Sequence, residues 1–263
     1  MIFSWLRNRR RRQRRAAPFP SEWQRILAEN VRLYALLTAE DQEKLRERIK
    51  IFVPEKKWVG CADQPINDEV QVTIAAQACL LLLGVEESYC FDDLLSILVY
   101  PNTYTQPPKM RQHQLVVEEQ VATLGEAWKR GPIVLTWAEA LRGGRQPHDG
   151  HLLVIHEFAH HVDGLDGDMD GTPPLRTSPE YHRWDHVVRV EYNRLVRQTQ
   201  QGRATLLDQY GASSRAEFFA VASECFFGRP LELRQQHTDL YEILQNLYRQ
   251  DPAQWPGYAQ AAG

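Results

Sequence analysis

Apolar residues recur at the three- and four-residue spacing of amphipathic helices in the first third of the chain. Ser21 is a typical helix N-cap, and the apolar positions after it predict a helix over residues 21–37. Thr38 starts a second predicted helix that runs through Phe52, and a third is expected over residues 67–83, just before Gly84. The N-terminal part of the domain is therefore expected to be helical.

The middle of the chain changes to short aliphatic and β-branched runs bounded by Pro, Asn and Gly, which predict strands. These runs are residues 94–100, 115–122 and 133–137. A loop over residues 143–150 leads to a helix that carries the main motif, and further helices are expected near 180–200, 214–227 and 238–249. The order of helices, a small mixed sheet and then helices predicts an α+β fold.

The composition is that of an ordinary globular protein, with 43% hydrophobic and 25% charged residues in 263. The longest apolar run, residues 74–83, is too short to span a bilayer and predicts a buried helix. The four cysteines lack Cys-x-x-Cys spacing and are too few for a disulfide framework. We therefore expect reduced thiols and a cytoplasmic location.

Positive charge is concentrated at the start of the chain. Residues 1–15 contain seven Arg and no acid, whereas the remainder has 24 Lys and Arg against 34 Asp and Glu. Trp5 and Leu6 precede the Arg run, which is the reverse of a secretory signal. Because charge blocks usually stay solvated, residues 1–20 are predicted to be a basic disordered arm. An anionic membrane surface is the alternative contact for this arm, and the acidic body disfavours nucleic acid. One domain is expected over 21–250, followed by a C-terminal tail at 251–263.

The candidate chemistry lies in the pentapeptide His156-Glu157-Phe158-Ala159-His160. On a helix, two His four residues apart share one face, where both imidazoles can bind one metal ion. Glu157 points about 100° round the helix, where it can reach a metal-bound water instead of the metal. The motif is therefore typical of a zinc hydrolase with Glu157 as general base.

A catalytic zinc ion needs a third protein ligand beside the two His. The metzincin extension would place Gly at 163 and His at 166, but the chain has Asp163 and Asp166, which leaves Asp166 only as a carboxylate alternative. Glu217 and Glu224 share one face of a predicted apolar helix, where carboxylates are costly to bury unless they are paired or bind metal. A His-Glu-x-x-His helix followed by a Glu on a second helix is the gluzincin arrangement, so Glu217 is the predicted third ligand.

Other acidic residues lie near the motif. Asp163 and Glu224 are on the right elements to bind the outer ring nitrogens of the ligand imidazoles, which need such partners. The acidic run at residues 166–170 matches the first half of a calcium loop, but the twelfth position holds Thr177 in place of the required Glu. A flexible acidic loop is therefore expected there.

Several segments together resemble the Mlc titration factor A family over about residues 20–250. They are Val99-Tyr100-Pro101, Gly125-Glu126-Ala127-Trp128, Gly131-Pro132-Ile133-Val134-Leu135-Thr136-Trp137, the helix from His156 to Asp163, Ala216-Glu217 and Ser223-Glu224. Members of that family are zinc-dependent peptidases, similar in catalytic core to the anthrax lethal factor protease domain. The resemblance implies a zincin-like metallopeptidase fold with His156, His160 and Glu217 as ligands, Glu157 as base and Tyr210 as hydrogen-bond donor to the transition state.

The predicted function is hydrolysis of peptide bonds with one zinc ion per chain, and aminopeptidase action is one form that it can take. Zinc would lower the pKa of a bound water toward about 7, and Glu157 would take its proton and pass it to the leaving amine. By analogy with gluzincins, the substrate backbone would pair with the strand Ile133, Val134, Leu135, Thr136 and Trp137. The alternative is a regulatory protein that sequesters an Mlc-like transcriptional repressor, with the zinc site secondary.

Overall fold

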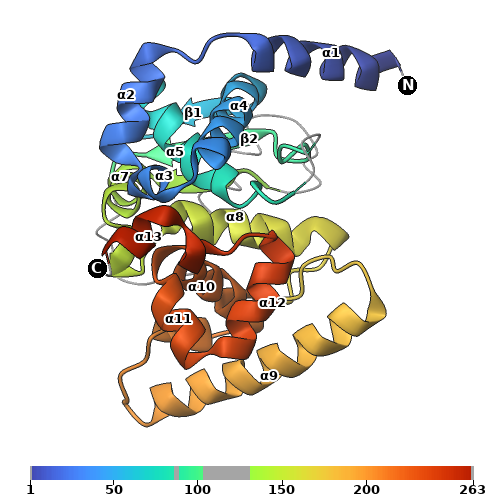
Figure 1. Cartoon of the computed structure of the whole chain (residues 1–263), viewed down its shortest axis with the longest axis vertical. Coiled ribbons are helices and arrows are strands. Elements are labelled where there is room, and N and C mark those ends of the chain that lie inside the picture. The colour runs from blue at the N-terminus through green and yellow to red at the C-terminus, as the bar shows by residue number, and fades with distance from the viewer. Residues whose placement is uncertain (1, 86–88, 103–130, 262–263) are drawn as a thin grey trace.

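The computed structural model describes residues 2–85, 89–102 and 131–261. The N-terminal helices are α1 (Ile2–Ala16), α2 (Ser21–Asn30), α3 (Arg32–Leu36), α4 (Ala39–Glu55) and α5 (Asp68–Leu80). After the strands come α7 (Trp137–Arg145), α8 (Leu153–Asp163), α9 (Ser178–Gln200), α10 (Arg215–Gly228), α11 (Pro230–Gln236), α12 (Thr238–Tyr248) and α13 (Pro256–Ala261). Figure 1 shows the N-terminal helices and the sheet above α8, with α9 to α12 below it.

The sheet contains β1 (Lys57–Gly60), β2 (Ser96–Tyr100) and β3 (Ile133–Thr136) in the order β1-β2-β3. Val59 is opposite Leu98, and Leu98 is opposite Val134. Both pairings are parallel where the sequence predicted a mixed sheet, and parallel neighbours require crossover connections such as the one through α5. The strand predicted at residues 115–122 lies outside the described residues, and β1 was not predicted because four residues carry little periodicity.

Side-chain caps set the start of α4 and α5 near the predicted positions, whereas the predicted cap Ser21 is instead the first residue of α2, whose N-cap Pro20 makes no side-chain hydrogen bond. Thr38 Oγ1 accepts a hydrogen bond from the Asp41 amide at 3.1 Å and begins α4. Asn67 caps α5 through the Val70 amide at 3.0 Å. The single helix predicted over residues 21–37 is instead divided into α2 and α3 at Val31, whose φ of −127° and ψ of 83° are not helical.

The motif helix lies inside the core. One continuous cluster of buried apolar side chains extends from α2 to α13, and α8 contacts α5, α7, β3 and α10. Phe158 of α8 packs edge-to-face against Phe91 with ring centroids 4.8 Å apart, and at a tilt against Phe52 of α4 with centroids 5.8 Å apart. These aromatic contacts hold α8 against the N-terminal helices. The four cysteines are free and buried.

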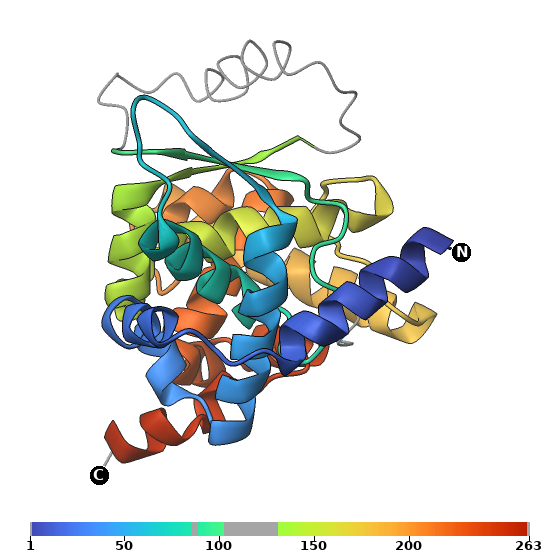
Figure 2. The same ribbon diagram turned by 90° about the horizontal axis from the view of Figure 1, so that it is seen from above.

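The structure has a helix, α1, where the sequence predicted a disordered arm. Arg11 is only 4% exposed, and its Nη2 lies 2.6 Å from Glu55 Oε2 and 2.5 Å from Asp92 Oδ1. Since these acids are distant in sequence, their pairing with Arg11 could not be inferred from local charge. Figure 2 shows α1 along one edge of the molecule, beside α4. Within the described residues, no helix has the length and apolar character needed to cross a membrane.

The helix α7 occupies part of the segment that the sequence predicted as a loop over residues 143–150. Gly144 faces α2 and α5 so closely that a Cβ atom there would lie 2.4 Å from the Asn30 carbonyl oxygen and 3.1 Å from Gln77 Nε2. This approach explains a glycine near the end of a helix, where it is otherwise unfavourable.

We expect Gly144→Ala to lower the free energy of unfolding by about 1–2 kcal/mol, because overpacking against a backbone oxygen costs about 2–3 kcal/mol and outweighs the gain of about 1 kcal/mol in helix propensity. Urea unfolding measures the difference. Gly164→Ala is the control, since its Cβ would meet only the Met169 side chain, at 3.3 Å. A Gly144→Ala protein more stable than the parent would contradict the close approach.

Candidate metal centre

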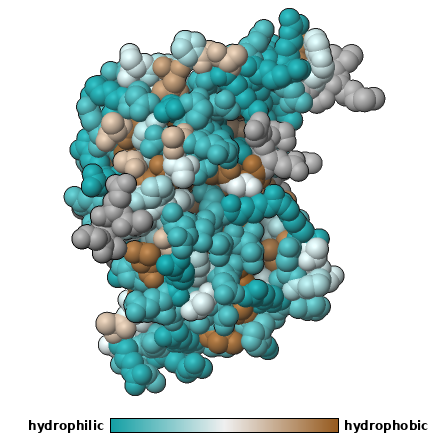
Figure 3. Space-filling view, in the orientation of Figure 1, coloured by the Kyte–Doolittle hydropathy of each residue, from teal (hydrophilic) through white to brown (hydrophobic). Residues whose placement is uncertain are grey.

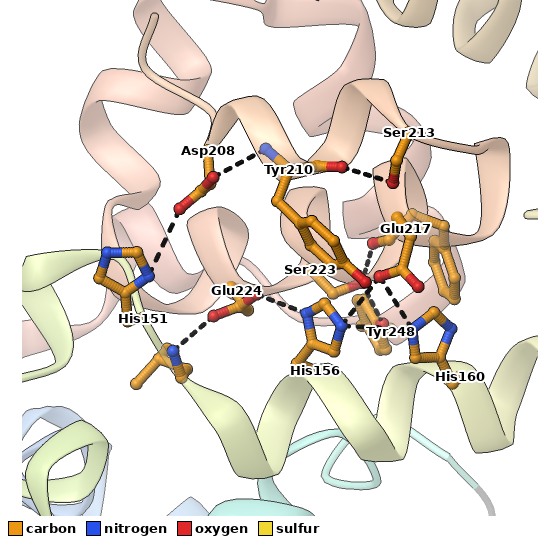
Figure 4. Close-up of polar contacts among 12 residues, drawn as sticks. His151, His156, His160, Asp208, Tyr210, Ser213, Glu217, Ser223, Glu224 and Tyr248 are labelled. Carbon is orange, nitrogen blue, oxygen red and sulfur yellow. Dashed lines mark hydrogen bonds and ion pairs between the residues drawn. The ribbon is translucent and has the colours of Figure 1, made fainter. Parts of the chain in front are cut away.

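A carboxylate from another helix caps the start of the motif helix α8. Leu152, at the N-cap position, has no capping side chain, and its amide instead donates to Glu224 Oε2 at 2.5 Å. Val154, Ile155, Phe158 and Ala159 bury the remaining faces of the helix. A negative group at this end also interacts favourably with the helix dipole. The burial of the other faces leaves His156 and His160 on the face toward α10 (Figure 4).

The facing helix α10 supplies both acids of the site. Ser214 is the N-cap and accepts a hydrogen bond from the Glu217 amide at 3.1 Å, which places Glu217 in the first turn. Glu224 follows seven residues later, two turns along the same face. From Phe218 onward every residue of α10 is buried, and most of them are apolar. The two carboxylates therefore project from a core helix toward the motif face of α8.

Three donor atoms converge between the helices. His156 Nε2 lies 3.2 Å from His160 Nε2 and 3.1 Å from Glu217 Oε2, and His160 Nε2 lies 3.3 Å from the same oxygen. In a tetrahedral zinc site with bonds of about 2.0–2.1 Å, neighbouring ligand atoms are about 3.3 Å apart. The three atoms thus fit three corners of that tetrahedron. In the described part of the chain, no other cluster of such side chains meets the spacing of a metal site.

The hydrogen bonds around His156 leave the centre electron-rich. Its Nδ1 lies 2.7 Å from Glu224 Oε1, so Nδ1 carries the ring proton and donates it to that carboxylate. Its Nε2 faces the Glu217 carboxylate and the second imidazole. Burial lowers the pKa of His156, but hydrogen bonds to Glu217 and Glu224 outweigh burial and raise it to about 10. The centre therefore attracts a cation, and a metal ion competes with the proton for it.

The pKa of Glu217 is also shifted by its contacts with the two imidazoles. Burial raises its pKa, but the hydrogen bonds to His156 and His160 dominate and hold the pKa of the carboxyl well below its usual range. The group therefore stays ionised. An ionised carboxylate and two imidazoles are the donor set that a catalytic zinc ion takes in gluzincins.

Tyr210 lies over the centre from a short 3-10 turn over Gln209–Ala212. Asp208 Oδ1 accepts the Tyr210 amide at 2.8 Å, and Ser213 Oγ donates to the Tyr210 carbonyl at 2.7 Å. Its ring centroid is 6.2 Å from that of His156, and its hydroxyl points toward Glu217 (Figure 4). Burial and the Glu217 charge raise the pKa of the phenol to about 12, so it remains a hydrogen-bond donor.

Glu157 lies beside this group without belonging to the donor triangle. Its charge raises the pKa values of both His156 and Tyr210, which places the carboxylate within electrostatic reach of the centre. The side chain is partly buried. Glu157 is not one of the three converging donor residues.

Asp163 does not make the contact that the sequence predicted. Its Oδ2 accepts the Gly171 amide at 2.9 Å, and no ring nitrogen of a ligand imidazole is its hydrogen-bond partner within the described residues. The carboxylate is fully buried, and burial raises its pKa to about 6. Asp163 thus holds the loop that follows α8. The signal for this role was Gly171, whose φ of +83° marks a turn.

The structure also shows where Asp166 and the predicted substrate strand lie. Asp166 is exposed, its Oδ1 accepts the Asp168 amide at 3.1 Å, and it is not among the converging donors. Of the predicted substrate strand, residues 133–136 form β3, which contacts α8, whereas Trp137 begins α7. Trp137 therefore belongs to a helix and not to the strand.

One polar pair beside the centre was not predicted. His151 Nδ1 lies 3.5 Å from Asp208 Oδ2, just before α8 and at the start of the Tyr210 turn. Both side chains are accessible, with 55% and 37% exposed. The Asp-x-Tyr spacing, typical of a side chain capping a turn, was the available signal. This pair adds exposed polar groups to the side of the centre where Tyr210 lies.

Comparison with known proteins places these residues in context. Residues 5–249 match the family described as glucose-regulated metallo-peptidase M90. An uncharacterized protein of Synechocystis, slr2042, is 38% identical over 237 residues, which cover 89% of this chain and 86% of that protein. Mlc titration factor A of Escherichia coli is 30% identical over 239 residues, covering 88% and 87%. The same protein of Shigella flexneri has the same identity and coverage.

We expect Glu217→Gln to reduce zinc affinity by more than about 100-fold, because a charged ligand becomes a weak neutral one. Asp166→Asn is the matched control and should leave affinity unchanged. Metal content after dialysis against a graded chelator distinguishes the two variants. If Asp166→Asn lowered zinc affinity more than Glu217→Gln does, the third ligand would be Asp166 and not Glu217.

Glu224→Gln should lower zinc affinity by about 10–100-fold while all three ligands stay in place, because the His156 ring loses its ionised partner. Glu232→Gln on α11 is the control, because 44% of this side chain is exposed and its ion pair is with Arg229, outside the donor triangle. Competition with a coloured zinc chelator measures both affinities. Equal zinc affinities in the two variants would show that Glu224 only caps the start of α8 and does not support the His156 ring.

Proposed function

Because the chain belongs to the M90 family of glucose-regulated metallopeptidases, we propose that it is a zinc-dependent peptidase with its active centre between α8 and α10. The observation that carries this proposal is the triangle of His156, His160 and Glu217 donor atoms, 3.1–3.3 Å apart. Two imidazoles and one carboxylate leave the fourth tetrahedral position to a water, as catalytic zinc sites require.

A zinc ion held there would supply Lewis acidity, lowering the pKa of water toward about 7 and polarising a peptide carbonyl. Glu157 accepts the proton from the attacking water and later delivers it to the leaving amine, so that one carboxylate serves both transfers. The Tyr210 hydroxyl donates a hydrogen bond to the carbonyl oxygen as negative charge develops on it. Its raised pKa, about 12, keeps that proton in place at neutral pH.

The remaining residues position these groups. Glu224 orients the His156 ring through Nδ1, so that Nε2 points at the metal position. The strand β3 is the last strand of the described sheet and contacts α8, which suits pairing with an extended peptide backbone. Aminopeptidase action on such a peptide is one form of this activity.

A second candidate function follows from the relatives named Mlc titration factor A, since that name describes titration of Mlc. This chain would then bind an Mlc-like repressor, and its zinc centre would be secondary. Peptidase and binding activities can occur together in one chain. They differ in their dependence on Glu157, because only the hydrolytic function needs a proton acceptor there.

Glu157→Gln should reduce kcat on peptide substrates by about 100- to 10,000-fold, the usual contribution of a general base, without loss of zinc. A quenched-fluorescent peptide library provides the rate, and atomic absorption provides the metal content. Glu29→Gln, at an exposed position on α2, is the control.

Full activity of the zinc-loaded Glu157→Gln protein would exclude this mechanism. If the chain acts only as a binder, Glu157→Gln should bind a purified Mlc-type repressor as tightly as the parent, and no peptide in the library should be cleaved by either.

A further inference from the structure

One face of α1 is fastened to the body of the protein. Arg7, Arg11 and Arg14 lie on this face, and they pair with Asp92 or Glu55 at 2.5–3.3 Å. Arg11 is the buried centre of the contact, with 5% of its side chain exposed. These ion pairs lie on the face of α1 that points toward the body of the protein.

The C-terminal end of α1 is also held in place. Lys50 of α4 donates to the carbonyl oxygens of Arg15 and Ala17, the latter at 2.7 Å. A cation at the end of a helix interacts favourably with the exposed carbonyl groups and the helix dipole. With this contact and the ion pairs, α1 is a fixed projection of the body and not a free tail.

The opposite face of α1 is exposed and combines apolar and basic side chains. At about 100° per residue, Trp5, Leu6 and Arg9 lie roughly 120–160° round the helix from Arg11. Trp5 is 54% and Leu6 38% exposed, and the Arg9 guanidinium lies 5.6 Å from the centroid of the Trp5 ring.

Two further exposed arginines border this face. Arg10 and Arg12 lie about 100° to either side of Arg11, so they flank the apolar residues of the outward face. Figure 1 shows α1 across the top of the molecule, and the corresponding part of the space-filling view in Figure 3 is mostly teal. The outward face is thus a short apolar strip with cations on both sides.

We propose that this outward face of α1 docks the protein on an anionic membrane surface. Trp and Leu side chains enter the interface between lipid headgroups and acyl chains, and flanking Arg side chains bind the lipid phosphates. Charge alone would serve a nucleic acid equally well, but the exposed Trp5 and Leu6 have no role in binding phosphates along a duplex. Their place between Arg10 and Arg12 therefore favours the lipid surface.

The attachment of α1 gives this docking a structural consequence. Because α1 is fixed through Arg11 and Lys50, membrane contact would orient the whole body relative to the bilayer. A single helical turn of apolar residues gives reversible association, so the protein would exchange between the surface and solution. The docking does not depend on the proposed peptidase activity, since α1 contributes no residue to the metal centre.

The test uses flotation of the full chain with phosphatidylcholine vesicles that contain about 30 mol% phosphatidylglycerol or none. The parent should float only with the anionic vesicles, and its partition should fall steeply as salt rises from about 50 to about 500 mM. Replacing Arg9, Arg10 and Arg12 with Ser should lower the partition coefficient on the order of 100-fold, since each cation contributes about fivefold.

The matched control replaces Arg189, Arg197 and Arg203 with Ser, three exposed arginines in or just after α9, which lies at the opposite end of the molecule from α1 (Figure 1). This variant should partition like the parent. Trp5→Ala with Leu6→Ala should also weaken binding to anionic vesicles, by about tenfold or more. Circular dichroism and thermal unfolding confirm that each variant is folded.

Two results would overturn the proposal. The first is equal partition of the parent onto vesicles with and without phosphatidylglycerol, or onto neither. The second is binding to duplex DNA that equals or exceeds vesicle binding, requires the three arginines and is insensitive to the Trp5 and Leu6 substitutions. That pattern would make the outward face a nucleic-acid surface.

Discussion

The imidazole of His156 lies between two carboxylates of one helix, and this contact organises the centre of the protein. Glu224 binds its Nδ1 at 2.7 Å, and Glu217 lies 3.1 Å from its Nε2. The seven-residue interval between them on α10 spans about 10.5 Å, or two turns, which one imidazole and a metal position can fill. Burial of these charges in an apolar core is tolerable only because each has a partner.

Glu224 connects this chemistry to the folding of α8. The same carboxylate that orients His156 accepts the Leu152 amide and completes the first turn of the motif helix. The helix start and the ligand ring are thus held by a single group from α10. The packing of α8 and α10, apolar on most faces, brings that group into place. The start of α8 and the orientation of the His156 ring are consequently coupled.

The N-terminal half supports the centre from the opposite side. Phe52 and Phe91 pack on Phe158 of α8, and the parallel sheet places β3 along the same helix. Asp92, the next residue after Phe91, belongs to the ion-pair cluster that holds α1. A short segment of chain therefore contacts both the motif helix and the basic helix at the surface.

Local patterns were sufficient for the features that depend on neighbouring residues in the sequence. The His-Glu-x-x-His spacing predicted two candidate ligands on one face, Thr38 and the region of Asn67 marked helix starts, and the two acids of α10 predicted a shared face with Glu217 as candidate third ligand. These inferences depend on helix geometry and on the cost of burying charge, and both are readable from residue type and interval.

Only the tertiary structure decided which distant groups meet. It assigned Glu224 to two donors at once, turned Asp163 toward Gly171 instead of an imidazole, and paired Arg11 with Glu55 and Asp92, residues 44 and 81 positions away. The sequence carries no local record of such pairs, because they arise from how helices pack and not from how they form. Charge composition alone thus predicted a disordered arm where packing produced a docked helix.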